Sequence, residues 1–213
     1  MLLPLLTAAA LTIPLAAGTA EASSTVAPTA ETPCAPCRTE RVLWRPDRRL
    51  RVRDFQGPLG ARAHAAEANT GIATRSYAGA NPRTFRLEAT TFFDPCKSWF
   101  REQPRAAERA ATLAHEQLHF DISELYARRL VRRYATEIRD HADFLRRHQR
   151  IYDEVWAESR AMQDAYDAAV YADEARQAEW DARVAAGLRE LADYAAKEAE
   201  LPMRAGDARF RRG

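Results

Sequence analysis

The distribution of apolar, polar and chain-breaking residues changes character near residue 104. Before that position, proline and glycine recur every few residues, and β-branched or aromatic residues cluster between them. Short clusters of this kind, bounded by turn residues, predict strands at 42–44, 50–55, 71–77 and 84–93. The segment Ala-Gly-Ala-Asn-Pro at 78–82 predicts a hairpin turn between the last two strands.

Helix is predicted for the second half of the chain. Proline is absent from residues 105–201, and Gly187 is the sole glycine in this stretch, which is rich in Ala, Arg, Glu and Leu. We expect one helix over 105–134 or beyond, a break within 139–143, and one or more long helices up to about residue 197.

Apolar residues recur at helical spacing in both parts of this helical region. The first part has an apolar face that we expect to pack on the sheet: Leu113, Ala114, Leu118, Ile122, Leu125, Tyr126 and Leu130. The second part has a corresponding stripe: Ile151, Val155, Met162, Tyr166, Val170, Trp180, Val184 and Leu188. The predicted fold is therefore α+β, with a small N-terminal antiparallel sheet packed on the first helix and long C-terminal helices after it.

The N-terminal residues have the composition of an export signal. Residues 1–17 carry no charge and are rich in leucine and alanine, and Ala20-Glu21-Ala22 has the small-x-small pattern that signal peptidases cleave. We expect a periplasmic or secreted protein with no stable membrane anchor after cleavage. The expected organisation is a signal peptide at 1–22, a flexible linker at 23–40, one folded domain at 41–200 and a disordered tail at 201–213.

Net charge and cysteine content narrow the class of protein further. The formal net charge is +2, a balance that predicts no nucleic-acid partner. Three cysteines, Cys34, Cys37 and Cys96, are compatible with one disulfide in an oxidising compartment, and the pairing is open. Cys34-Ala-Pro-Cys37 also has the spacing of a redox motif, but its proline-rich context favours a structural disulfide from this segment to Cys96.

The motif His115-Glu-Gln-Leu-His119 predicts a metal site. Two histidines four residues apart on a helix face the same way and can share one Zn²⁺, while Glu116 is placed to act as a general base toward water. The alternative is that both imidazoles only satisfy hydrogen bonds on a helix face.

A catalytic zinc site needs a third protein ligand, which the motif does not contain. The metzincin continuation is absent, because Leu125 stands where its third histidine would be. His141 and His148 lie in arginine-rich stretches typical of a helix surface. Acids that continue the inward apolar stripe are better candidates: Asp173 and Glu174 first, followed by Asp167 and Glu154. The alternative is that such an acid pairs with an arginine of the first helix.

Three further residues are candidates for supporting roles. Tyr166 and Tyr171 could each donate a hydrogen bond to the oxyanion of a tetrahedral intermediate, although an aromatic packed in the helical core is the simpler reading of either. Asp121 could accept the distal N–H of a ligand histidine, or form a surface ion pair with Arg128 or Arg129.

Several motifs together resemble a family of secreted bacterial proteins that are described as zinc-dependent proteases and share an HEQxHFD motif. They are Asp54-Phe-Gln-Gly-Pro58, His64-Ala-Ala66, Thr70-Gly-Ile72, Phe92-Phe-Asp-Pro95, Ser98-Trp99, His115 to Ile122, Glu124 to Arg128, Gln163, Tyr166-Asp167 and Gln177 to Trp180. The resemblance implies a zincin-like fold, a peptidase activity, His115 and His119 as ligands, and Glu116 as base.

This chain departs from the family pattern at one place. Relatives have a Thr and a His-Gly pair after the Tyr-Asp segment, where this chain has Val170, Ala172 and Asp173. If that histidine is the third ligand in relatives, Asp173 or Glu174 replaces it here, or the site binds metal weakly.

The leading hypothesis is an exported zinc metallopeptidase that cleaves a peptide or protein lying extended beside an edge strand at 84–93. A metal-dependent amidase acting on cell-wall peptides would share the chemistry. The alternative from another class is a non-catalytic envelope protein with a structural or vestigial metal site and a partner-binding C-terminal helix. The sequence does not indicate an oligomeric state.

Overall fold

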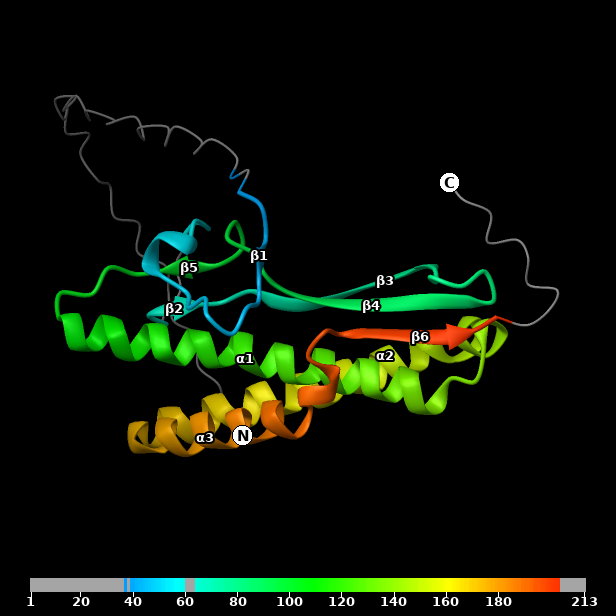
Figure 1. Ribbon diagram of the computed structural model, residues 1–213. Helices are drawn as coiled ribbons and strands as arrows, with labels where there is room; N and C mark the ends of the chain where they lie inside the picture. Colours follow the sequence, from blue (N-terminus) through cyan, green and yellow to red (C-terminus); the bar gives the residue numbers. More distant parts are fainter. Residues whose placement is uncertain (1–36, 38, 60–63, 204–213) are drawn as a thin grey trace, which may run out of the picture. The chain divides into compact units, whose positions relative to one another are not determined.

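The computed structural model describes residues 37, 39–59 and 64–203, all in the unit that follows Ala35. The expected signal peptide and most of the expected linker lie outside these residues. The strands are β1 Val42–Leu43, β2 Ala66–Glu67, β3 Thr70–Ala78, β4 Thr84–Phe93, β5 Trp99–Phe100 and β6 Glu198–Pro202. The helices are α1 Ala106–Glu137, α2 His141–Ala172 and α3 Gln177–Glu190 (Figure 1).

Strand β4 is the centre of the antiparallel sheet. Its residues alternate between buried and half-buried, as the period of two in its sequence requires. The predicted hairpin is confirmed, because β3 pairs with β4 from Thr70 opposite Phe93 to Ala78 opposite Phe85. The other edge of β4 is shared by β1 at one end and β6 at the other. The expectation that β4 offers a free edge to a substrate is therefore wrong.

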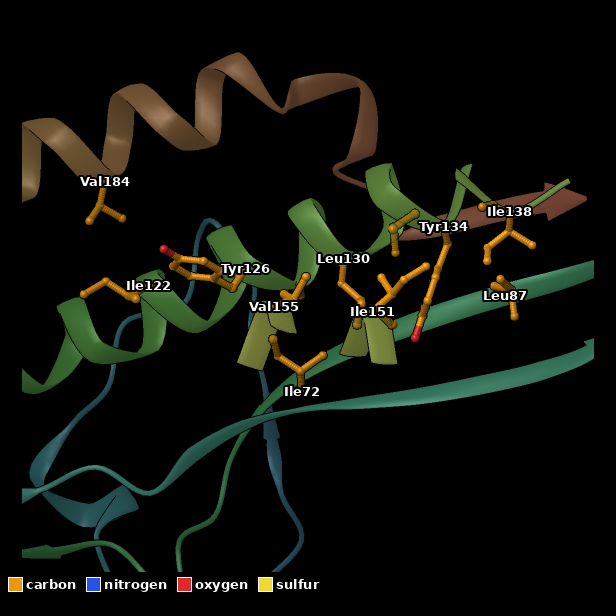
Figure 2. Close-up of a cluster of buried hydrophobic side chains, with 14 of the residues drawn as sticks. Ile72, Leu87, Ile122, Tyr126, Leu130, Tyr134, Ile138, Ile151, Val155 and Val184 are labelled. Atoms are coloured by element: carbon orange, nitrogen blue, oxygen red, sulfur yellow. The ribbon is translucent and has the colours of Figure 1, made fainter. Parts of the chain in front are cut away.

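The antiparallel sheet packs against the three helices, which confirms the α+β prediction. Helix α1 contacts β3, β4 and β6 as well as α2 and α3, so it is buried over most of its circumference between residues 115 and 134. Figure 2 shows Leu130 of α1 beside Ile151 of α2, and Ile72 of β3 near Val155 of α2, within one cluster of buried side chains. Each buried aliphatic side chain stabilises the fold by roughly 1.5–3 kcal/mol.

The helix boundaries follow local signals. Residues 138–140 separate α1 from α2 and overlap the start of the predicted break at 139–143. The Asp140 carboxylate caps α2 by accepting a hydrogen bond from the Asp143 N–H at 2.9 Å. The apolar face predicted for α1 is correct from Leu118 onward, whereas Leu113 is half-buried and Ala114 is exposed.

Two predicted segments differ in the structure. The strand predicted at 50–55 is a 3₁₀ turn, Val52–Asp54, because the Asp54 carboxylate accepts hydrogen bonds from the Arg51 N–H and the Arg48 guanidinium. Helix was also predicted up to about residue 197, but the chain turns after α3, with Lys197 at a φ of 56°, and forms β6. Strand β6 includes the first two residues of the predicted tail, and residues 204–213 lie outside the described part.

Cys37 and Cys96 form a disulfide, which confirms a link from the proline-rich segment to Cys96. Cys34 lies outside the described residues. None of the described helices is both long enough and apolar enough to cross a membrane.

A cluster of buried charges ties α1 to the C-terminal strand. Glu124 is fully buried, and its carboxylate accepts hydrogen bonds from the Thr91 hydroxyl at 2.8 Å, Arg128 Nε at 2.9 Å and Lys197 Nζ at 3.2 Å. Because Thr91 is on β4 and Lys197 immediately precedes β6, this cluster joins three elements.

Candidate metal centre

His115 and His119 face the same way on α1, as their spacing predicts. Both side chains are mostly buried, and their Nε2 atoms lie 3.1 Å apart. The Oδ1 atom of Asp167, on α2, lies 3.1 Å from Nε2 of His115 and 3.0 Å from Nε2 of His119. The three atoms form a nearly equilateral triangle, and in the described part of the chain no other group of three or more His, Cys, Asp or Glu side chains meets in this way.

The orientation of His119 is set by Gln163, four residues before Asp167 on α2. The Gln163 Nε2 donates a hydrogen bond to the His119 carbonyl oxygen at 3.1 Å. Because a carbonyl oxygen can only accept, the amide oxygen of Gln163 is the atom that faces His119 Nδ1, at 2.5 Å. Nδ1 must then carry the proton, and Nε2 of the neutral ring directs a lone pair toward His115 and Asp167.

The three converging donors fit a small divalent cation. The Asp167 Oδ1 is buried and has no aligned hydrogen-bond donor in the described structure, despite the nearby Nε2 atoms. Tetrahedral zinc with ligands at about 2.0–2.1 Å spaces them about 3.3 Å apart, close to the 3.0–3.1 Å found here. Two imidazoles and one carboxylate form a ligand set with a coordination position left for water or substrate.

The electrostatics of the group also call for a cation. Burial works to raise the pKa of Asp167, yet the imidazoles of His115 and His119 hold it well below its usual range. Burial works to lower the pKa of His119, but the carboxylates of Asp167 and Glu116 raise it on balance. Two carboxylates therefore favour positive charge at the point where the donors meet.

Glu116 lies beside this triangle on α1. It is only 4% exposed, and its Oε2 accepts a hydrogen bond from the Ala68 N–H at 2.7 Å. Burial raises the pKa of Glu116, against the opposing effect of the two imidazoles. A carboxylate with a raised pKa is a better proton acceptor at neutral pH, as a general base requires.

Two cavities, of about 390 and 380 Å³, flank the triangle and share His64, Ala66, Glu116 and Tyr171 in their walls. The first is on the His119 side and is called the polar cavity here because most of the residues that line it are of polar type, among them Asn69, Thr70, Ser159, Arg160, Gln163 and Asp167. The second is on the His115 side and has small side chains in its wall, including Ala65, Ala111, Ala114 and Val170. The site is thus open on both sides.

The two tyrosines have different surroundings. Tyr166 is fully buried, and its hydroxyl lies 2.7 Å from Gln177 Oε1 and 3.3 Å from the His115 carbonyl, so its donor is used within the protein. Its ring stacks on His115, which gives it a packing role. Tyr171 is 62% exposed. Its ring also stacks on His115, and it lines both cavities.

Asp121 does not contact a ligand histidine. Its carboxylate accepts hydrogen bonds from Trp44 Nε1 at 2.7 Å, Gln117 Nε2 at 2.9 Å and Arg49 at 3.0 Å. The predicted ion pair exists with Arg49 rather than Arg128 or Arg129, because the segment before the 3₁₀ turn covers this face of α1.

The acid that meets His115 and His119 in the described structure is Asp167, whereas Asp173 and Glu174 lie outside this group. Helix α2 ends at Ala172, and Asp173 has an extended backbone and caps the following turn through Ala175 N. Glu174 is exposed and lines the second cavity. The other candidates also lie elsewhere: His141 against Phe85, His148 on Phe144, and Glu154 paired with Arg133.

Sequence reasoning included Asp167 only as a lesser candidate and gave Gln163 no role. One signal was available, because Gln163 and Asp167 have the same four-residue spacing as His115 and His119. Ser123, whose hydroxyl lies 3.4 Å from Gln163 Nε2 and 2.8 Å from the Thr70 hydroxyl, had no such signal.

Comparisons of the chain with protein-family models, with curated proteins and with solved structures find no match. The feature that bears on function is therefore the geometry of the His115, His119 and Asp167 group.

Proposed function

We propose that this protein is an exported zinc-dependent metallopeptidase. The observation that carries the proposal is the triangle of donor atoms from His115, His119 and Asp167, with edges of 3.0–3.1 Å, next to the buried carboxylate of Glu116. Two imidazoles and one carboxylate are a common set for a hydrolytic zinc. A bound zinc would act as a Lewis acid that polarises a carbonyl group and lowers the pKa of water.

The protein side chains then have separate tasks. Glu116 takes a proton from the attacking water and delivers it to the leaving amine. Gln163 holds the ring of His119 in place through Nδ1. Tyr171, exposed at the junction of the two cavities, is the phenol best placed to donate a hydrogen bond to the oxyanion. Tyr166 keeps the packing role described above.

A substrate backbone is proposed to lie along residues 66–70, which line the polar cavity. Farther along β3, the Tyr152 hydroxyl of α2 donates to the Ile72 carbonyl at 2.9 Å and covers that edge. Residues 66–70 thus replace β4 as the segment beside which an extended peptide binds.

Two further observations support export and a catalytic rather than vestigial site. A disulfide such as Cys37–Cys96 is typical of oxidising compartments, in agreement with a periplasmic or secreted location. A vestigial site would lack a third ligand, and Asp167 is a candidate for that ligand. The resemblance to zinc-dependent proteases remains part of the proposal, as does cell-wall peptide as an alternative substrate.

Metal analysis and one matched pair of variants test the proposal. The purified mature protein should bind one zinc per chain and hydrolyse members of a mixed peptide library. Glu116→Gln should keep the zinc and lower kcat/KM by about 10³-fold, since it removes the general base. Glu108→Gln, at an exposed position in the first turn of α1, is the control and should keep wild-type activity. Full activity of Glu116→Gln would show that another group is the base, and no binding of zinc in excess would remove the proposal.

A further inference from the structure

Arg160 is the one cationic side chain in a stripe of α2 that faces the site. Trp156, Arg160, Gln163 and Asp167 follow each other at spacings of four, three and four residues, which places them on one face of a helix. All four line the polar cavity. Among the described residues that line either cavity, Arg160 is the sole lysine or arginine.

Arg160 differs from the other arginines of α2 in its charge partners. The other arginines of α2 each have an acidic partner: Arg146 and Arg147 pair with Asp143, and Arg150 pairs with Glu154. In the described part of the chain Arg160 has no ion-pair partner, although Asp164 follows it by one helical turn. Arg160 is exposed and lines a cavity next to the metal centre.

The surroundings of Arg160 suit recognition of a planar anion. Trp156 beside it is held by stacking on Tyr152, with ring centroids 6.4 Å apart and planes at 9°, and so forms a fixed apolar wall. Asn69 and Thr70 contribute polar groups to the same cavity. A guanidinium presents paired N–H donors that match the two oxygens of a carboxylate.

We propose that Arg160 binds a carboxylate of the substrate and makes this a peptidase selective for an acidic residue near the cleaved bond. Arg160 lies seven residues before Asp167, or about 10 Å along the helix axis. An extended peptide advances about 3.3 Å per residue, so the carboxylate belongs to a residue two or three positions from the cleaved bond. The inference rests on the proposed function, because it assigns the substrate class of the same site.

Peptides that differ in one residue test the inference. In a peptide that the enzyme cleaves, Glu, Gln or Lys is placed at each of the three positions on either side of the cleaved bond, with a free or an amidated C-terminus. We expect Glu to be preferred at one position two or three residues away. Arg160→Gln should lower kcat/KM for that Glu peptide by about 10-fold, without lowering it for the Gln peptide, and Arg160→Glu should reverse the preference toward Lys. An effect of amidation alone would assign the carboxylate to the peptide terminus.

Arg150→Gln is the matched control on the same helix, since Arg150 is exposed and does not line either cavity; it should leave the selectivity unchanged. A binding assay separates this inference from the proposed function. Anisotropy of labelled Glu and Gln peptides is measured on the zinc-loaded Glu116→Gln variant, with and without Arg160→Gln. Selective binding of the Glu peptide that requires Arg160 supports the inference even if the wild-type protein hydrolyses no peptide. Equal binding of both peptides overturns it, whatever the hydrolytic activity.

Discussion

The two glutamates Glu116 and Glu124 lie about two turns apart on α1 and have opposite surroundings. Both are buried, with exposed fractions of 4% and 0%. Glu124 accepts hydrogen bonds from two cationic side chains and a hydroxyl, so its charge is balanced within the fold. Glu116 has one backbone donor from Ala68 and lies beside three atoms whose lone pairs converge.

Under the proposed function, one helix carries both a structural and a functional acid. A buried charge costs stability unless it is paired, and Glu124 is paired by Arg128 and Lys197. Among the described residues, Asp167 pairs only with the imidazoles of His115 and His119, and Glu116 has no ion pair with a lysine or arginine. Room for an external cation at this point is what the proposed function requires.

Exchanging each glutamate for glutamine tests this comparison most strongly. Glu124→Gln removes the negative charge between Arg128 and Lys197 and should lower the free energy of unfolding by about 3 kcal/mol. Glu116→Gln keeps an acceptor for the Ala68 N–H, so in the absence of zinc it should change the free energy of unfolding by less than about 1 kcal/mol. Urea denaturation of the metal-free proteins measures both values. Equal losses in the two variants would contradict the distinction between a structural and a functional acid.

Stabilisation by zinc tests the donor set. At a zinc concentration 100 times the Kd, the wild-type protein should gain about 2.7 kcal/mol in its free energy of unfolding. Asp167→Asn removes one ligand and should lose most of this gain at the same zinc concentration. Asp173→Asn is the matched control, because Asp173 caps a turn outside the triangle, and it should respond to zinc like the wild type. The reverse pattern would restore Asp173 as the ligand.

The smallest effect is expected from the residue that orients His119. Gln163→Ala leaves all three donors in place but frees Nδ1 of His119, and it should weaken zinc binding by about 10- to 100-fold. Gln149→Ala changes an exposed glutamine of the same helix, whose side chain contacts Asp153, and should leave the affinity unchanged. Competition with a chromophoric chelator measures the Kd of each variant. An unchanged affinity in Gln163→Ala would mean that helix packing alone orients the ring.

Features that depend on neighbours in the chain were predictable. The hairpin of β3 and β4 follows from alternation and a glycine-containing turn, and the break before α2 follows from an aspartate cap. The pairing of His115 with His119 depends only on the helical repeat, which is the same wherever the helix lies. For the same reason the inward stripe of α2 was correct at Ile151, Val155 and Tyr166.

The predictions differ from the structure where a local rule was applied beyond its element. Asp173 and Glu174 were chosen by continuing the α2 stripe, but the helix ends at Ala172, after which the repeat no longer sets direction. Strand β6 was missed because its five residues gain their hydrogen bonds from β4, far away in the sequence. That pairing in turn makes β4 a central strand and leaves residues 66–70 to line the site.

The sequence alone determined that one turn of α1 presents two imidazoles and a carboxylate, since the backbone geometry of a helix is local. Only the tertiary structure decided which acid completes the group. Asp167 reaches His115 and His119 because α2 packs on α1, and this packing depends on side chains spread along both helices and the sheet. The same packing brings Gln163 to His119 and Arg160 to the cavity, and no spacing within the chain specifies such contacts.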